Sequence, residues 1–394
     1  MQKTLRPYAT AGVAIVGATL ITVPPAVASL PDIPAARDVA LTSFLTDAMA
    51  PWIDQYNIAA QNATVLANNF NVAPSVALQQ FIANQYGYIQ EILNDPSKIP
   101  DVVSEMQEHM RAVSSAYTLL GIAPDDTTTA ATTILHTLSG SDLSTFALGH
   151  DALYTLLPQL LPALLPPGTD TEPIVQLVNF ISSPMSGMIM GLIGPGISPW
   201  IALLNSITDG DGLNQTLANM IGAGFNGATL NLDFLIPLLG DAVPAGVLSH
   251  IDLAFGGLLS TGVVGNSPYT SYDSSGDVVS AVPAVGGSIF NSVGITIDAS
   301  ALLGVPLTLD IQSHGVGPIG ALMGWEQALA GLLGGEAWNW GGKSGGPPPP
   351  ADPPLAGFSF PVVPSDFFDD GGAGSGAADG FDWTSLMDAL GLNP

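Results

Sequence analysis

The side chains of this sequence that could do chemistry are few and widely spaced. The chain has no cysteine, so thiolate nucleophiles and thiolate metal ligands are excluded. Its five histidines are His109, His136, His150, His250 and His314. No two of them have the spacing of a metal-binding helix such as His-Glu-x-x-His. We therefore interpret the histidines as surface or capping residues.

Two serines come near to a nucleophile elbow, whose Gly-x-Ser-x-Gly pattern exposes the serine on a sharp turn. Ser198 in Gly-Ile-Ser-Pro-Trp and Ser267 in Gly-Asn-Ser-Pro-Tyr both lack the second glycine. The sequence Asp209-Gly-Asp211-Gly resembles the start of a calcium loop, but Leu213 stands where a third ligand is needed. The sequence therefore predicts no enzyme, no cofactor and no metal site.

The charge of the chain is almost entirely acidic. It has 33 Asp and Glu against 6 Lys and Arg, and no Lys or Arg lies between Arg111 and Lys343. Nucleic acid is excluded as a partner, because too few cations are present to neutralise phosphates. The acids either keep an apolar exported protein soluble or line a path for cations. Asp298 and Asp310 are the candidate acids for such a path, since both take the polar positions of alternating segments.

The N-terminus has the three parts of a secretory signal. Its first six residues include the basic Lys3 and Arg6, residues 11–23 are small and apolar, and Ala-Val-Ala at 26–28 is a small-x-small cleavage site. We expect cleavage between Ala28 and Ser29 and export of the mature chain. The apolar centre is short for a retained membrane anchor and ends in two prolines.

Residues 29–140 are predicted to be helical. Apolar residues recur at helical spacing at 76–93 and 102–117. Pro51 is expected to begin a new helix, and Asp95-Pro96 is expected to end one. Several amphipathic helices with short breaks predict a helical bundle.

Residues 141–260 are apolar and heavily interrupted by glycine and proline. Leu-Leu-Pro recurs every four residues at 156–168, and each proline deletes a helical hydrogen bond, so no regular helix is predicted there. Residues 173–208 contain no ionisable side chain, but three prolines interrupt them. We expect short helical pieces buried against protein, at a subunit contact or an envelope lipid surface, rather than one membrane span; a re-entrant hairpin is the alternative. Gly187 and Gly191 have the spacing that permits close packing.

Residues 261–340 change from helical to strand periodicity. Residues 295–298 and 307–312 alternate apolar and polar side chains, as half-buried strands do, and the segment SALLGVP connects them. Shorter strands are predicted at 229–233 and 277–282, and a helix at 319–333. The result is a small antiparallel sheet with too few strands to close a barrel.

Residues 341–394 are predicted to be a disordered acidic tail, because glycine and proline dominate it. The final stretch FDWTSLMDALGLNP restores an apolar stripe and predicts a short helix. The expected fold class is α+β, mainly α: an N-terminal helical bundle, an apolar Gly/Pro-interrupted middle, a small antiparallel sheet and a disordered Gly/Pro-rich tail. The expected divisions are 1–28, 29–140, 141–260, 261–340 and 341–394.

Four stretches of the chain share their texture with one protein family. They are LRPYATAGVAIVGATLI, LPDIPAARDVALTS, the block from GNSPYTSYDSSG to LGVPLTLDIQSHGVGP, and FDWTSLMDALGLNP. Together they resemble the GjpA-type outer-membrane porins of actinobacteria that contain mycolic acids. The resemblance implies an envelope protein that assembles into a water-filled, cation-preferring channel, but it carries no pore residues with it. Long helical regions and few strands depart from a single-chain outer-membrane barrel.

Two classes of function follow. The first is an oligomeric, cation-preferring outer-membrane porin for small hydrophilic solutes. The second is a non-catalytic secreted surface or lipid-binding protein, which the apolar middle and the predicted tail favour. Both place the protein outside the cytoplasmic membrane, in the outer membrane, on the cell envelope or secreted. The expected partners are further copies of the chain and an envelope lipid or outer membrane.

Overall fold

The computed structural model describes residues 35–72, 74–141, 148–164, 168–242, 246–265, 269–272, 278–298, 308–334 and 359–363. The chain forms two compact units, of which Pro51–Val362 is one, and the other combines Met1–Ala50 with Val363–Pro394. The predicted signal segment, the cleavage site at Ala28 and Ser29, Ser267, and the tail apart from 359–363 lie outside the described residues. The elements below belong to the unit Pro51–Val362, except for the first residues of the N-terminal helix, α2 (Ala35–Val72), which fall in the other unit.

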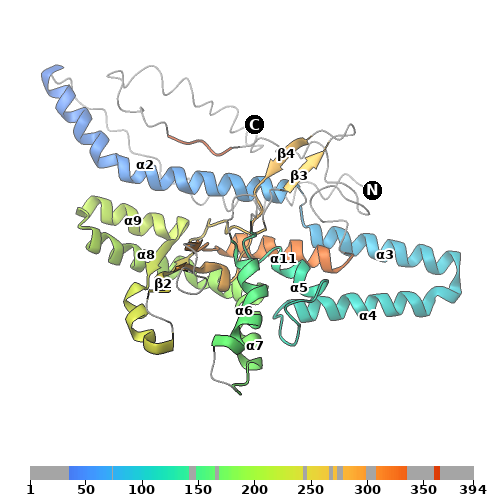
Figure 1. The fold of residues 1–394 in the computed structure, drawn as a ribbon. Coiled ribbons are helices and arrows are strands. Elements are labelled where there is room, and N and C mark those ends of the chain that lie inside the picture. Colours follow the sequence, from blue (N-terminus) through green and yellow to red (C-terminus); the bar gives the residue numbers. More distant parts are fainter. Residues whose placement is uncertain are drawn as a thin grey trace, which may run out of the picture. The chain divides into compact units, whose positions relative to one another are not determined.

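The N-terminal half is helical, as predicted, with α2 (Ala35–Val72), α3 (Val76–Asn94) and α4 (Ile99–Ala116) in sequence (Figure 1). The expected start of a helix at Pro51 is wrong, because α2 continues through it. The expected break after α3 is confirmed. The backbone N–H of Asp95 closes α3 on the carbonyl of Glu91, and the Asp95 carboxylate accepts from the backbone N–H of Ser97 at 3.0 Å.

The next helices are α5 (Thr129–Ile134), α6 (His150–Leu164) and α7 (Glu172–Ile181). The prediction that the Leu-Leu-Pro repeat prevents a regular helix is wrong, because α6 runs through two of its prolines. The burial of side chains on one side of α6 stabilises the helix and offsets the hydrogen bonds that its prolines remove. Tyr154 is fully buried, and its Oη donates to Asn179 Oδ1 of α7 at 2.9 Å.

The ionisable-free stretch forms most of α8 (Pro184–Asp209), followed by α9 (Leu213–Asn226). The expected short helical pieces are therefore wrong: α8 is one helix of 26 residues that contains Pro195 and Pro199. It begins where Ser183 Oγ accepts from the backbone N–H of Ser186, and it ends at Gly210 with φ 76°. The prolines predicted breaks in the helix, but contacts with the rest of the unit stabilise it as one continuous element.

Glycines on one side of α8 explain how closely it packs. A Cβ atom at Gly187 would stand 2.0 Å from the carbonyl oxygen of Gly287, and one at Gly194 would stand 2.2 Å from that of Gly256. At Gly191 the nearest atom, in Gly317, would be 2.9 Å away. The predicted close approach therefore exists, and the partners are loop backbones of the same chain.

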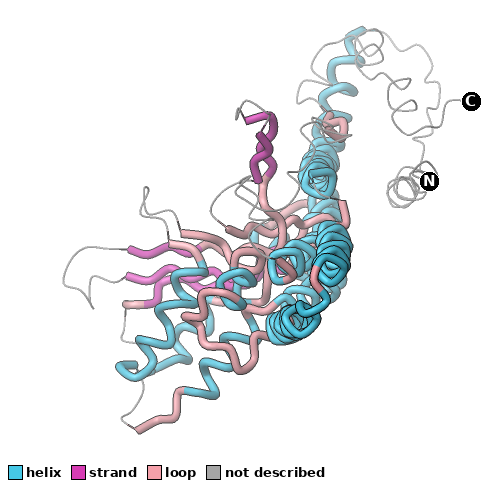
Figure 2. The backbone as a smooth tube through the Cα atoms, turned by 90° about the vertical axis from the view of Figure 1, so that its right-hand side faces the viewer, coloured by secondary structure: helices cyan, strands magenta, loops and turns pink. Residues whose placement is uncertain are grey.

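A four-stranded antiparallel sheet has the order β1 (Ala228–Asn231), β2 (Leu248–Phe255), β5 (Val293–Asp298) and β6 (Thr308–Ile311). The predicted strands at 229–233, 295–298 and 307–312 correspond to β1, β5 and β6, whereas the inner strand β2 was not predicted. A separate pair joins β3 (Tyr269–Tyr272) to β4 (Val278–Val282) (Figure 2). The predicted helix at 319–333 is α11 (Pro318–Leu332).

The core lies where α11 meets its neighbours. Met323 of α11 packs with Leu66 of α2, Leu259 and Val285, while Ala321 packs with Met190 of α8 and Val316. A further cluster, formed by Leu138, Tyr154, Val178 and Phe290, joins α6 and α7 to the loop that precedes β5. These buried side chains hold α8 and the sheet in one unit.

Candidate functional site

The polar face of the four-stranded sheet gathers acids that are distant in sequence. The register pairs Thr296 of β5 with both His250 of β2 and Asp310 of β6, and paired residues share a face. Asp298 lies two positions after Thr296 and shares this face. Thr296 Oγ1 donates to Asp310 Oδ1 at 2.9 Å, and Asp310 is exposed whereas Asp298 is partly buried. The two acids singled out from the sequence therefore lie on one face beside a histidine.

His250 sits between two carboxylates. Its Nδ1 is 2.8 Å from Asp233 Oδ1, and its Nε2 is 3.0 Å from Asp252 Oδ2. Both carboxylates, the hydrogen bond to Asp233 first, raise the pKa of His250. Asp233 also accepts from the backbone N–H of Ile251 at 2.9 Å, and this bond is the main reason that its pKa lies below the ordinary value. The ring is therefore stabilised as an imidazolium that ties Asp233 to β2.

The interpretation of the histidines as surface or capping residues is wrong for His136 and His150, which are 2% and 1% exposed. His250 does lie at the surface, with its side chain 38% exposed, but its pairing with two acids was not predicted. The sequence pattern that could have predicted this pair is His250-x-Asp252 within a strand, because alternation puts both side chains on one face of the sheet. The strand itself escaped prediction because the apolar residues of LSHIDLAF do not alternate strictly.

Replacing His250 with glutamine is expected to destabilise the fold more in mild acid than in base. A raised folded-state pKa gives stability that is present below the unfolded value of about 6.5 and is lost as pH rises through the folded value. The expected loss is roughly 0.2–1 kcal/mol near pH 5.5, the range of exposed ion pairs, and approaches zero near pH 9. Urea unfolding of both proteins at each pH measures it, and an equal loss at both would contradict the ion-pair account.

Asp252 owes its position to a glycine on the neighbouring strand. The register places it opposite Gly294, where a Cβ atom would stand 2.3 Å from Asp252 Oδ1. That oxygen is buried and makes no hydrogen bond with any residue that the structure describes.

Across the described ranges, no three or more His, Cys, Asp or Glu side chains cluster closely enough to hold a metal ion.

A buried serine and histidine form the other notable polar pair. Ser139 Oγ is 2.8 Å from His150 Nδ1, and His150 Nε2 is 2.7 Å from the Val293 carbonyl oxygen. Since a carbonyl only accepts, Nε2 carries the proton and Ser139 donates to Nδ1. Burial lowers the pKa of His150 to about 4. Both side chains are buried, and Asn291 Oδ1 accepts from the Ser139 backbone N–H at 2.7 Å, so the pair connects loops to α6 and β5.

The described residues of the elbow-like and calcium-like motifs make contacts that stabilise the fold. Ser198 is buried in α8 and donates to the carbonyl oxygen of Phe255 at 3.1 Å. Asp209 is the last residue of α8, and Asp211 Oδ2 accepts from Asn219 Nδ2 at 3.1 Å. Neither arrangement exposes a nucleophile. The absence of enzymatic activity stays a prediction.

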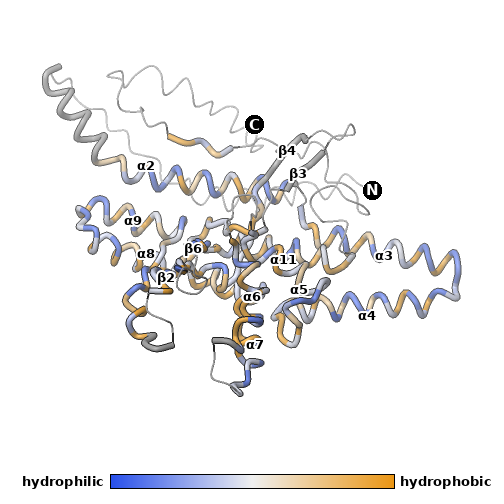
Figure 3. The backbone as a smooth tube through the Cα atoms, in the orientation of Figure 1, coloured by the Kyte–Doolittle hydropathy of each residue, from blue (hydrophilic) through white to orange (hydrophobic). Residues whose placement is uncertain are grey.

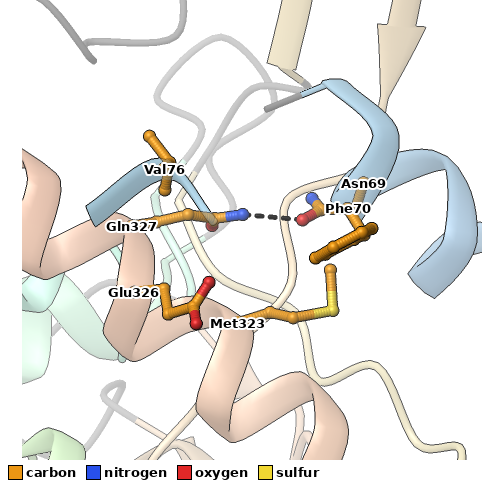
Figure 4. A pocket seen from close by; sticks show the side chains of 6 residues that line it. All are labelled: Asn69, Phe70, Val76, Met323, Glu326 and Gln327. Carbon is orange, nitrogen blue, oxygen red and sulfur yellow. Dashed lines mark hydrogen bonds between the residues drawn. The ribbon is translucent and has the colours of Figure 1, made fainter. Parts of the chain in front are cut away.

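One small depression lies between α2, α3 and α11 (Figure 4). It is lined by Asn69, Phe70, Val76, Met323, Glu326 and Gln327. Gln327 Nε2 donates to Asn69 Oδ1 at 2.6 Å, and burial raises the pKa of Glu326. The space accommodates about one water molecule, which is too little for a substrate.

An extended apolar surface belongs to α8 and α9, which pair as antiparallel helices (Figure 1). Asn219 Nδ2 donates to Ser206 Oγ at 3.0 Å on the line where they meet. The exposed apolar residues of α8 and α9 that form this surface, here called the α8–α9 face, are Ile189, Leu192, Ile193, Ile197, Trp200, Leu204, Ile207, Leu213, Leu217 and Ile221. On both helices they are rotated in the same sense from the contact line, so they share one side of the pair.

Within the described ranges, α8 is the one helix that is long and apolar enough to cross a membrane. In its most apolar window 39% of the residues are buried inside the protein, so the helix is covered on one side and open on the other. Comparison with known proteins gives no independent assignment: no family model, no curated protein and no solved structure matches this chain.

Proposed function

We propose that this chain is an exported, non-catalytic cell-envelope protein that binds an uncharged lipid surface through the α8–α9 face. The observation that carries the proposal is the exposure of that face: Leu192 is 73% exposed, Trp200 65% and Ile207 67%. Contiguous apolar surfaces of this kind on soluble proteins mark binding sites. The secretory-type N-terminus and the family resemblance favour the same location.

The covered side of α8 favours a helix that lies in the lipid interface. Gly187, Gly191 and Gly194 are held against loop backbone, so lipid cannot surround α8 unless the core opens. The opposite side has aromatic and aliphatic residues and no ionisable group, which suits insertion to the depth of one helix face. Trp200 fits such a surface because indole favours the boundary between headgroups and hydrocarbon.

The predominantly acidic charge of the protein restricts the kind of lipid that it can bind. Amphipathic helices that bind anionic membranes usually carry Lys and Arg on the polar side, and α8 and α9 have neither. The surrounding carboxylates would be repelled by anionic headgroups. The preferred surface is therefore one of uncharged or zwitterionic headgroups over hydrocarbon.

A cation-preferring porin is the second candidate, favoured by the acidic sheet face. Asp298 and Asp310 share that face with no Lys or Arg from residue 112 to 342 to offset them. In a channel, potassium should be preferred over chloride, and replacing both acids with asparagine should weaken this preference. Planar bilayer recordings in a salt gradient test the candidate, and no conductance from any purified oligomer would remove it.

The lipid proposal is tested by vesicle flotation of the mature chain. We expect it to float with phosphatidylcholine vesicles and to float less with vesicles that contain a third phosphatidylglycerol. Raised salt should reduce the difference between the two vesicles, because the screening length shortens from about 10 Å at 0.1 M to about 3 Å at 1 M. Failure to float with either vesicle would overturn the proposal. Stronger flotation with the anionic vesicle would contradict its charge argument.

A further inference from the structure

We propose that His250 works as a pH-sensitive latch, which fastens the 3-10 helix η2 (Asp233–Ala242) to the sheet when its ring is charged and loosens η2 when the ring is neutral. The latch consists of the ring and the two carboxylates beside it, those of Asp233 and Asp252. η2 lies between β1 and β2 in the chain. The latch acts within the sheet and does not depend on lipid.

η2 takes the place of a neighbouring strand along part of β2. The register pairs β1 only with Asp252–Phe255, so β1 does not cover the first half of β2. There the backbone N–H of Ile251 donates to Asp233 Oδ1 at 2.9 Å, and the Ile251 carbonyl accepts from the backbone N–H of Leu232 at 2.9 Å. The Asp233 carboxylate therefore replaces the acceptor that a strand would supply.

Apolar packing holds η2 only in part. Phe234 is 66% exposed and Leu238 76%, although the coil below β2 is mainly hydrophobic (Figure 3). Leu235 and Ile236 are half-buried. Because the stabilisation from apolar burial scales with the area removed from water, exposed side chains contribute little to it. The contacts of Asp233 therefore matter for the attachment of η2.

The two carboxylates around His250 require a doubly protonated ring. Nδ1 is 2.8 Å from Asp233 Oδ1, and Nε2 is 3.0 Å from Asp252 Oδ2. An ionised carboxylate only accepts hydrogen bonds, whereas a neutral imidazole has one N–H and one lone pair. When the ring loses a proton, a lone pair faces a carboxylate oxygen. One of the two contacts must then open.

The other groups on this face also favour the charged ring. Thr296 of β5 lies opposite His250, and Asp298 of β5 and Asp310 of β6 are further acids of the same face. No Lys or Arg occurs from residue 112 to residue 342. The hydrogen bonds to the two carboxylates raise the pKa of the ring. The latch is therefore closed in mild acid, and it loosens as the pH rises through that raised value.

Asp252 determines which of the two contacts opens. Its side chain is 17% exposed, and its buried Oδ1 has no hydrogen-bond partner among the described residues. If the ring also left, neither oxygen would have a partner there, and an unpaired buried acceptor is costly. Asp233 is 42% exposed and also accepts from Asn231 Nδ2 at 3.0 Å, so it loses less. The neutral ring therefore keeps its proton on Nε2, toward Asp252, and the contact with η2 opens.

Hydrogen exchange of the Ile251 amide tests the latch, because this N–H donates to the carboxylate that the ring fastens. After correction for the intrinsic effect of pH on exchange, we expect its protection factor to be about 1.5- to 5-fold lower at pH 8.5 than at pH 5.5. This range corresponds to the usual strength of an exposed ion pair. Leu253 of the same strand pairs with β1, so its protection should not follow this change.

The matched control is His109→Gln on α4, which should leave the change at Ile251 intact. Equal protection of Ile251 at both pH values would overturn the proposal. An equal change at Leu253 would do the same, because it would show that the whole sheet opens rather than η2 alone.

Two further variants are expected to remove the pH dependence in opposite ways. His250→Gln has both of its side-chain donors on one nitrogen and cannot reach both carboxylates, so protection of Ile251 should be low at both pH values. In Asp252→Asn the neutral ring can accept from the new amide while Nδ1 still donates to Asp233, so protection should stay high at both. Low protection in Asp252→Asn at pH 8.5 would contradict the latch.

The nitrogen chemical shifts of the His250 ring give a direct check of the direction in which the latch opens. We expect a doubly protonated ring at pH 5.5 and the tautomer with its proton on Nε2 at pH 8.5. A proton on Nδ1 at pH 8.5 would show that the contact with Asp252 opens instead, and η2 would stay fastened.

Discussion

Gly194→Ala is expected to destabilise the protein by about 1–3 kcal/mol, the usual cost of overpacking a core. A Cβ atom there would stand 2.2 Å from the carbonyl oxygen of Gly256, so either α8 or the loop after β2 must move. Backbone cannot rotate away as a side chain can. Urea unfolding followed by circular dichroism would measure the change in the free energy of unfolding.

Gly196→Ala is the matched control, two residues further along the same helix. Gly196 is exposed, and an added Cβ would meet nothing within 4 Å. Alanine is preferred over glycine inside a helix, so this variant is expected to gain about 0.5–1 kcal/mol. If both variants shifted stability in the same direction by the same amount, α8 would not be packed against the loops as described.

The double variant Trp200→Glu and Ile207→Glu is expected to lose binding to neutral vesicles by about a hundredfold or more. Burying one large apolar side chain contributes about 1.5–3 kcal/mol, and 1.4 kcal/mol corresponds to tenfold in affinity. Both side chains are mainly exposed, so folding should be affected little. Flotation across a range of lipid concentrations measures the partition coefficient.

The double variant Met106→Glu and Met110→Glu supplies the control for that experiment, because it adds the same two charges to exposed apolar positions of a different surface. It should bind vesicles as the wild type does. Equal loss of binding in both proteins would show that added negative charge, rather than the α8–α9 face, determines lipid binding.

The mainly helical α+β class and several strands could be predicted because they rest on local periodicity. β5 and β6 alternate cleanly, and Asp95-Pro96 combines two local signals that end a helix. The continuous α6 and α8 could not be predicted in the same way. Their prolines oppose a helix locally, and the favourable contacts of Tyr154 and Gly194 come from segments far away in sequence.

The candidate sites differ in the same way, because some rest on local sequence patterns and others on contacts between distant segments. Asp298 and Asp310 were found from strand alternation within single segments. The pairing of Asp233 with His250 depends on a turn of the chain and the register of β2, neither of which leaves a local signature. The α8–α9 face escaped for a related reason, since apolar composition alone does not tell which side of α8 the glycines cover.

The central claim is that the α8–α9 face contacts lipid, and an environment-sensitive fluorophore tests it most directly. The cysteine-free chain allows one label at Ile207→Cys, on the face, and one at Glu108→Cys, an exposed position on α4. On addition of phosphatidylcholine vesicles, the account predicts a blue shift and quenching by lipid-borne quenchers at position 207 and no change at position 108. No change at 207, or the same change at both positions, would contradict it.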